Sequence, residues 1–176
     1  MRRGRGARVM AVWDGLELWL AGLFGVCALL VEGYQVFGRY IDPRLSITWG
    51  DEVIVYFIVW AVFLASSQLV RTDGHVRPDL VLRLLPARAQ RVVEIGNCLV
   101  ALGFCLGLTW LGFEIAQSAF DFDDRSSTGL SFPMWLYYAA LPTGAGLMSA
   151  RYVIRLHRYV FRFDPATMTI GISHHG

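Results

Sequence analysis

The chain alternates between long apolar stretches and short polar connections. Apolar residues dominate at about 13–37, 50–70, 91–116 and 132–155. An α-helix rises about 1.5 Å per residue and the hydrocarbon core of a bilayer is about 30 Å thick, so about 20 residues are enough to cross it. The pattern therefore predicts an all-α membrane protein with four transmembrane helices, and Pro142 is expected to bend the fourth.

The arginines indicate how these helices are oriented. The chain contains 16 arginines and no lysine, and most of the arginines lie in three blocks. The blocks contain Arg2, Arg3, Arg5 and Arg8; Arg71, Arg77, Arg83, Arg88 and Arg91; and Arg151, Arg155, Arg158 and Arg162. The other two connections contain Arg39, Arg44 and Arg125. Because basic residues near span ends are retained in the cytoplasm, we expect both termini to be cytoplasmic.

This topology leaves room for one domain. We assign residues 1–12 to a basic cytoplasmic N-terminus, residues 13–158 to a single four-helix membrane domain and residues 159–176 to a cytoplasmic tail. With 55% hydrophobic residues the chain is too apolar for a soluble domain, and arginines at span ends suit a membrane surface rather than nucleic acid. Asp14 and Glu17 interrupt what would be the apolar core of a signal peptide, so we interpret the start as an uncleaved span.

The connection between the second and third predicted spans has an amphipathic pattern at about 77–85. Pro78 suits the first position of a helix, and apolar residues recur at helical spacing opposite Arg77 and Arg83. These apolar residues are Leu80, Val81, Leu84 and Leu85. The pattern predicts a short helix in the inner membrane surface, and a plain linker is the alternative.

The residues that commonly hold cofactors are poorly placed for that role. Cys27, Cys98 and Cys105 lie within predicted spans without a Cys-x-x-Cys pair, which is typical of buried apolar thiols. The histidines lie at span edges or in the tail, where they cannot serve as axial haem ligands. We therefore expect no cofactor, metal or disulfide in this chain.

A few acidic residues lie within or beside the predicted spans. Glu52 stands at the edge of the second span, where it can reach water, interact with the helix N-terminus or pair with a cation. Arg39, at the same expected edge, is one candidate for that cation. Glu32 lies deep in the first span and shares a helix face with Arg39, seven residues later. Glu94 is expected to reach head-group water.

Several short motifs resemble, in their order and spacing, those of a known family. They are Gln35-Val-Phe-Gly-Arg39-Tyr40, Trp49-Gly-Asp-Glu52, Trp60 with Phe63-Leu64, Arg71 leading to Gly74-His75, and Leu85-Pro86. The chain resembles the DctQ family, the small membrane subunits of tripartite ATP-independent periplasmic (TRAP) transporters. The resemblance covers nearly the whole chain, although the third and fourth spans match mainly in hydropathy.

The resemblance implies a part in the uptake of an organic acid across a bacterial inner membrane. A periplasmic binding protein would deliver the substrate transiently, a large membrane subunit would move it by a sodium-coupled elevator motion, and the small subunit would brace the large one. The small subunit would then bind neither sodium nor substrate. The residues expected at the subunit contact, or in organising the local fold, are Arg39, Trp49, Glu52, Trp60, Arg71 and His75.

Two other classes of protein are compatible with a small membrane domain. A four-helix proton-coupled exporter would use Glu32 or Glu17 as its proton site and would work without partners. An intramembrane enzyme would need His, Cys, Ser or Asp side chains that converge at one depth, and the predicted spans offer no such group. The sequence also lacks the paired broken segments that mark a complete carrier, which favours a subunit.

Overall fold

The computed structural model describes residues 5–45, 47–71 and 86–162 of the chain, and these residues are helical apart from their connections. The elements are α1 (Arg5–Tyr40), the 3-10 helix η1 (Pro43–Leu45), α2 (Gly50–Arg71), α4 (Ala87–Asp121), α5 (Met134–Tyr138) and α6 (Ala140–Phe161). This confirms the all-α class. The amphipathic helix predicted at about 77–85 lies outside the described residues.

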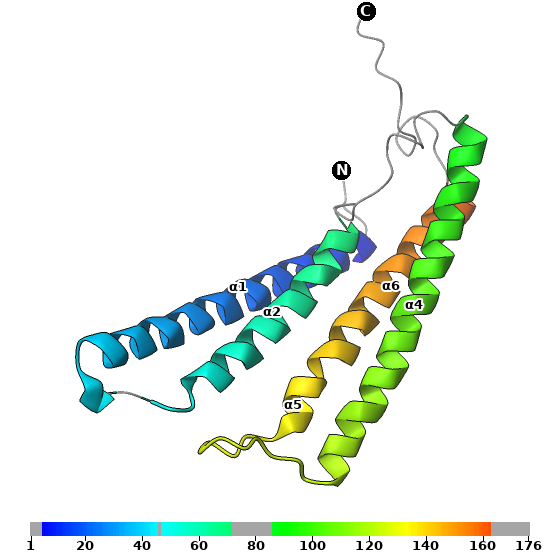
Figure 1. The fold of residues 1–176 in the computed structure, drawn as a ribbon. Coiled ribbons are helices and arrows are strands. Elements are labelled where there is room, and N and C mark those ends of the chain that lie inside the picture. The colour runs from blue at the N-terminus through cyan, green and yellow to red at the C-terminus, as the bar shows by residue number, and fades with distance from the viewer. Residues whose placement is uncertain (1–4, 46, 72–85, 163–176) are drawn as a thin grey trace, which may run out of the picture.

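The long helices stand side by side in the order α1, α2, α6, α4, an arrangement that we call the helix row (Figure 1). α1 packs against α2, α4 packs against α6, and the contact between α2 and α6 joins the two antiparallel hairpins. A row that is one helix thick leaves both of its faces open. Large apolar side chains are accordingly exposed along the outer helices, among them Trp19 (81%) on α1 and Trp110 (68%) on α4.

The apolar faces of the helix row are suited to lipid rather than to water. Met10–Tyr40, Gly50–Arg71 and Arg88–Asp121 are long and apolar enough to cross a membrane. α6 does not reach the same apolarity, because Arg151, Arg155 and Arg158 lie within it, so the fourth span remains a prediction. The 36 residues of α1 correspond to a length of about 54 Å, which exceeds the hydrocarbon thickness and requires tilt or projection beyond it.

A break between α5 and α6 follows from Pro142. Proline has no N–H group, and its ring conflicts with the carbonyl group four residues earlier, which here belongs to Tyr138. Tyr138 is the last residue of α5, and α6 begins after Ala139. The helix is therefore interrupted at Ala139, one turn before Pro142, while the bend expected at this point stays a prediction.

The contact between the two hairpins depends on a missing side chain at Gly144. A Cβ atom added to Gly144 would lie 2.6 Å from Cβ of Phe63 and 3.0 Å from its carbonyl oxygen, so α2 and α6 approach too closely for any larger residue. Gly103 of α4 is different, because no heavy atom lies within 4 Å of a Cβ added there. Gly144 thus belongs to the internal packing, whereas Gly103 faces outward.

We expect Gly144→Ala to destabilise the protein by about 1–3 kcal/mol, because the new methyl group forces α2 and α6 apart. The measurement is thermal unfolding of the purified protein in mild detergent. Gly103→Ala is the matched control, and it should melt at or above the wild-type temperature because alanine favours a helix. Equal melting temperatures for Gly144→Ala and the wild type would contradict the close contact.

Candidate functional site: an ion-pair network between three helices

Polar residues from three helices meet at the end of the helix row where α1 begins and α2 ends. Asp14 and Glu17 stand three residues apart and share one face of α1. Ser67, Gln68 and Arg71 lie in the last two turns of α2, and Arg151 lies in α6. The antiparallel hairpins bring these segments to the same end of the molecule. We call the six residues the ion-pair network.

Arg151 is the centre of the ion-pair network. Its Nη2 atom lies 2.5 Å from Oε2 of Glu17 and its Nη1 atom 2.9 Å from Oδ1 of Asp14, while Nε donates to the Ser67 hydroxyl at 2.7 Å. The guanidinium group also lies over the ring of Trp13, with Cζ 4.9 Å from the ring centroid. Only 3% of the Arg151 side chain is exposed. Every nitrogen of this buried cation therefore has a partner.

Residues of α2 complete the network. The Ser67 hydroxyl donates to Oε1 of Glu17 at 3.0 Å, and Nε2 of Gln68 donates to Oε2 of Glu17 at 2.6 Å. Arg71 pairs with Oδ2 of Asp14 at 3.2 Å and donates from Nε to the side-chain oxygen of Gln68 at 3.0 Å. Two carboxylates thus face two guanidinium groups, and the network is electrically neutral.

The neutral pairing explains how charged groups persist in an apolar protein. An isolated charge in a medium of low polarity costs several kcal/mol, and this cost is offset only when opposite charges and hydrogen bonds surround it. Both oxygens of Glu17 accept hydrogen bonds. Oε1 accepts from Ser67 and, at 2.5 Å, from Nε1 of Trp13, while Oε2 accepts from Gln68. The arrangement can hold α1, α2 and α6 in fixed register. It leaves no carboxylate oxygen of Glu17 free for a ligand.

A second set of polar contacts joins α4 to α6 at the same end. Oε2 of Glu94 lies 3.0 Å from Nη2 of Arg155, and Glu94 is only 6% exposed. The expectation that Glu94 reaches head-group water is therefore wrong, because α6 provides a cation beside it. Arg91 donates to the carbonyl oxygens of Tyr159 and Val160, at 2.9 and 2.8 Å, and so caps the C-terminus of α6.

At the other end of α2, Glu52 is tied to the loop that follows α4. The Thr128 hydroxyl donates to Oε2 of Glu52, while Oε1 is buried without a hydrogen-bond partner in the structure. Arg39 is exposed at the end of α1, and no ion pair links it to Glu52 within the described residues. This geometry differs from the pairing of Glu52 with Arg39 that the sequence led us to expect.

Aromatic residues of α2 hold α5 in place. Nε1 of Trp60 donates to the carbonyl oxygen of Leu136 at 3.1 Å, and the Tyr56 hydroxyl lies 3.4 Å from the sulfur of Met134. Beside these contacts lies an apolar cavity of about 360 Å³, lined in part by Phe24, Phe57, Trp60 and Leu136. Trp60 therefore joins the two hairpins.

The loop before α5 has its own ion pair. Asp123 accepts hydrogen bonds from Nε and Nη2 of Arg125, and these bonds with the nearby carboxylate charge raise the pKa of Arg125. Arg125 is exposed, so the pair organises the loop surface. Within the described parts of the chain, no three His, Cys, Asp or Glu side chains are grouped so as to hold a metal ion.

The structure does not bring the predicted site residues together. Arg39, Trp49 and Glu52 lie near one end of the helix row, Arg71 lies at the opposite end, and Trp60 lies between them. Glu32 is exposed on α1. His75 lies outside the described residues. Among the predicted site residues that the structure describes, only Arg71 belongs to the ion-pair network.

Comparison with known proteins identifies the family. Residues 18–162 match the family described as "Tripartite ATP-independent periplasmic transporters, DctQ component". The chain is 24% identical over 172 residues to the C4-dicarboxylate TRAP transporter small permease protein DctQ of Vibrio cholerae, a match that covers 84% of this chain and 72% of that protein. The same-named protein of Rhodobacter capsulatus is 29% identical over 115 residues, which cover 62% of this chain and 48% of the relative.

A further relative carries the matched region within a longer protein. The isethionate TRAP transporter permease protein DctMQ of Oleidesulfovibrio alaskensis is 23% identical over 158 residues, a match that covers 87% of this chain and 24% of that protein. The chain thus spans less than half the length of two of these relatives. The family match covers most of the chain, which makes the chain a multi-pass membrane protein rather than an enzyme. The chain therefore belongs to the DctQ family, the small permease subunits of TRAP transporters.

Proposed function

We propose that the chain braces the large, sodium-coupled elevator subunit of a TRAP transporter in a bacterial inner membrane. The transporter would take up an organic acid, such as a C4-dicarboxylate, that a periplasmic binding protein delivers. The chain itself would bind neither sodium nor substrate, and both of its termini would lie in the cytoplasm. Its contribution is mechanical, because a moving elevator needs a part that is fixed in the membrane.

The observation that carries this proposal is the ion-pair network within a row of apolar helices. In the network, Arg151 of α6 is bound to Asp14 and Glu17 of α1 and to Ser67 of α2. Such buried, directional contacts resist sliding or rotation of the three helices. The open faces of the helix row provide apolar area for lipid on one side and for a larger membrane protein on the other.

The relatives support a partner of this kind. The protein named DctMQ contains the region similar to this chain as 24% of its length, so the small component occurs there in one polypeptide with additional sequence. Two components that function as one chain in a relative are expected to bind each other when they are separate. The large TRAP membrane subunit is therefore the partner that we propose for this chain.

The geometry is less favourable for a proton-coupled exporter. A proton carrier needs a carboxylate that water or a substrate can reach, whereas Glu17 is 3% exposed and ion-paired with Arg151. Glu32 is exposed on the outer surface of α1, where the helix row encloses no passage. The described residues thus give the exporter hypothesis no buried, unpaired carboxylate in either predicted position.

We expect the tagged chain, coexpressed with the large TRAP subunit of the same organism, to copurify with it in mild detergent. Vesicles that contain both subunits should take up the organic acid when its binding protein and a sodium gradient are supplied. Vesicles that contain the chain alone should show no flux. Uptake by the chain alone would overturn the proposal, and so would the absence of copurification together with unimpaired uptake by the large subunit alone.

We expect Arg151→Met to destabilise the chain by about 3–5 kcal/mol, because it leaves Glu17 as a buried, unpaired charge. The double variant Glu17→Gln/Arg151→Met should recover part of this loss, since Asp14 keeps Arg71 as its partner. The measurement is again thermal unfolding in detergent. Arg39→Met is the matched control at an exposed position, with an expected effect of about 0.5 kcal/mol or less. If Arg151→Met and Arg39→Met melt alike, the network does not hold the helices together.

A further inference from the structure

Arg158 in the last turn of α6 and Arg162 directly after the helix take no part in the polar side-chain contacts among the described residues. Arg158 and Arg162 are exposed, and their guanidinium groups form no ion pair or hydrogen bond with the other described residues. They are not needed to cap α6, because Arg91 already binds the carbonyl oxygens of Tyr159 and Val160. Among the described residues, the two guanidinium groups are therefore available to a ligand.

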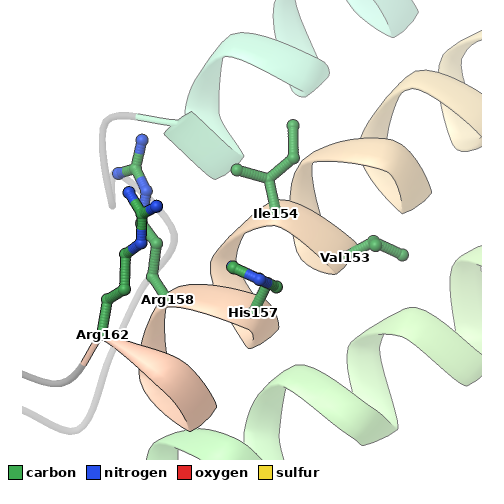
Figure 2. Close-up of a pocket in the computed structure, with 5 residues that line it drawn as sticks. All are labelled: Val153, Ile154, His157, Arg158 and Arg162. Atoms are coloured by element: carbon green, nitrogen blue, oxygen red, sulfur yellow. The ribbon is translucent and has the colours of Figure 1, made fainter. Parts of the chain in front are cut away.

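Both arginines line one pocket, of about 510 Å³, together with Val153, Ile154 and His157 (Figure 2). Ile154 and Arg158 lie four residues apart on one stripe of α6, and Arg162 follows at the same interval directly after the helix. The stripe is apolar toward the middle of the helix and cationic at its end. Figure 2 shows the two guanidinium groups on the same side of the chain, beyond Ile154.

We propose that this pocket binds the phosphate group of an anionic phospholipid such as phosphatidylglycerol. The planar guanidinium group forms paired hydrogen bonds with phosphate oxygens, and two such groups at adjacent turns can hold one head group. His157 adds a ring N–H to the same pocket. Val153 and Ile154, which also line the pocket, can contact the acyl chain of the lipid. A soluble phosphate would leave this apolar half of the pocket unused, which favours a lipid.

The stripe also matches the direction in which a lipid would lie. Arginines at the end of a membrane helix extend toward the head groups, while apolar residues one turn nearer the middle face the acyl region. The proposal requires that α6 is embedded in a bilayer. It does not require the large subunit, so a failure of the bracing function and a failure of this lipid site can be distinguished.

The test is native mass spectrometry of the purified chain, titrated in detergent with phosphatidylglycerol and, separately, with phosphatidylcholine. We expect the wild type to bind one phosphatidylglycerol in preference to phosphatidylcholine. Since a hydrogen bond contributes about 1 kcal/mol net, the loss of one guanidinium–phosphate contact from each arginine in Arg158→Gln/Arg162→Gln should weaken this binding about 30-fold. A melting curve for each variant shows that the substitutions leave the fold intact.

The matched control is Arg8→Gln/Arg88→Gln, which removes the same charge from two exposed arginines that do not line the pocket. This control should bind phosphatidylglycerol as the wild type does. Equal weakening in both double variants would overturn the proposal, because it would show a general effect of charge. Displacement of the lipid by millimolar glycerol phosphate would also overturn it, since the ligand would then be a free phosphate.

Discussion

The arrangement of the helices depends on the burial of the Arg151 guanidinium group. A buried cation is tolerated only where carboxylates and hydrogen-bond acceptors surround it, and these groups must come from neighbouring helices. Glu17 and Asp14 supply the negative charges from α1, while Ser67 supplies an oxygen from α2. The pairing fixes the depth of α6 relative to both helices, because a shift of one residue would separate the charges. Internal apolar packing could not give the same precision, since few large side chains are fully buried in the described residues.

The helix row changes what the rest of the sequence must provide. In a bundle, each helix needs one apolar stripe, whereas in a row that is one helix thick the outer surfaces are apolar on several sides. Residues such as Val100 (76% exposed) and Leu29 (73% exposed) are then expected components of a lipid- or protein-facing surface. Stability of the row comes from specific contacts between neighbours, including the close approach at Gly144 and the hydrogen bond from Trp60 to Leu136. An extended apolar surface on a rigid frame is also what a bracing subunit requires.

The sequence predicted those features that depend on one helix at a time. The apolar runs predicted the existence of α1, α2 and α4 and the bounds of α2, but α1 and α4 extend several residues beyond their predicted spans at both ends, because polar residues continue a helix outside the apolar run. The break before α6 is explained by Pro142. The sequence did not predict the ion-pair network, because partner choice depends on which helices are adjacent. Arg151 was interpreted as a cation at the membrane surface, yet it is buried. One signal was available: the expected topology placed Asp14, Glu17, Gln68 and Arg71 at the same membrane edge as Arg151, with matched charges.

The contrast between Arg151 and Arg158 shows how position along one helix separates a structural role from an exposed one. The two arginines are seven residues apart, so they lie on nearly the same face of α6. Arg151 is level with the acidic residues of α1 and is 4% exposed, whereas Arg158 lies two turns further on and is exposed. No described carboxylate of α1 lies beyond Asp14 toward that end, so α1 offers Arg158 no acidic partner among the described residues. The same residue type therefore fixes the fold at one depth and faces the surroundings of the protein at the next.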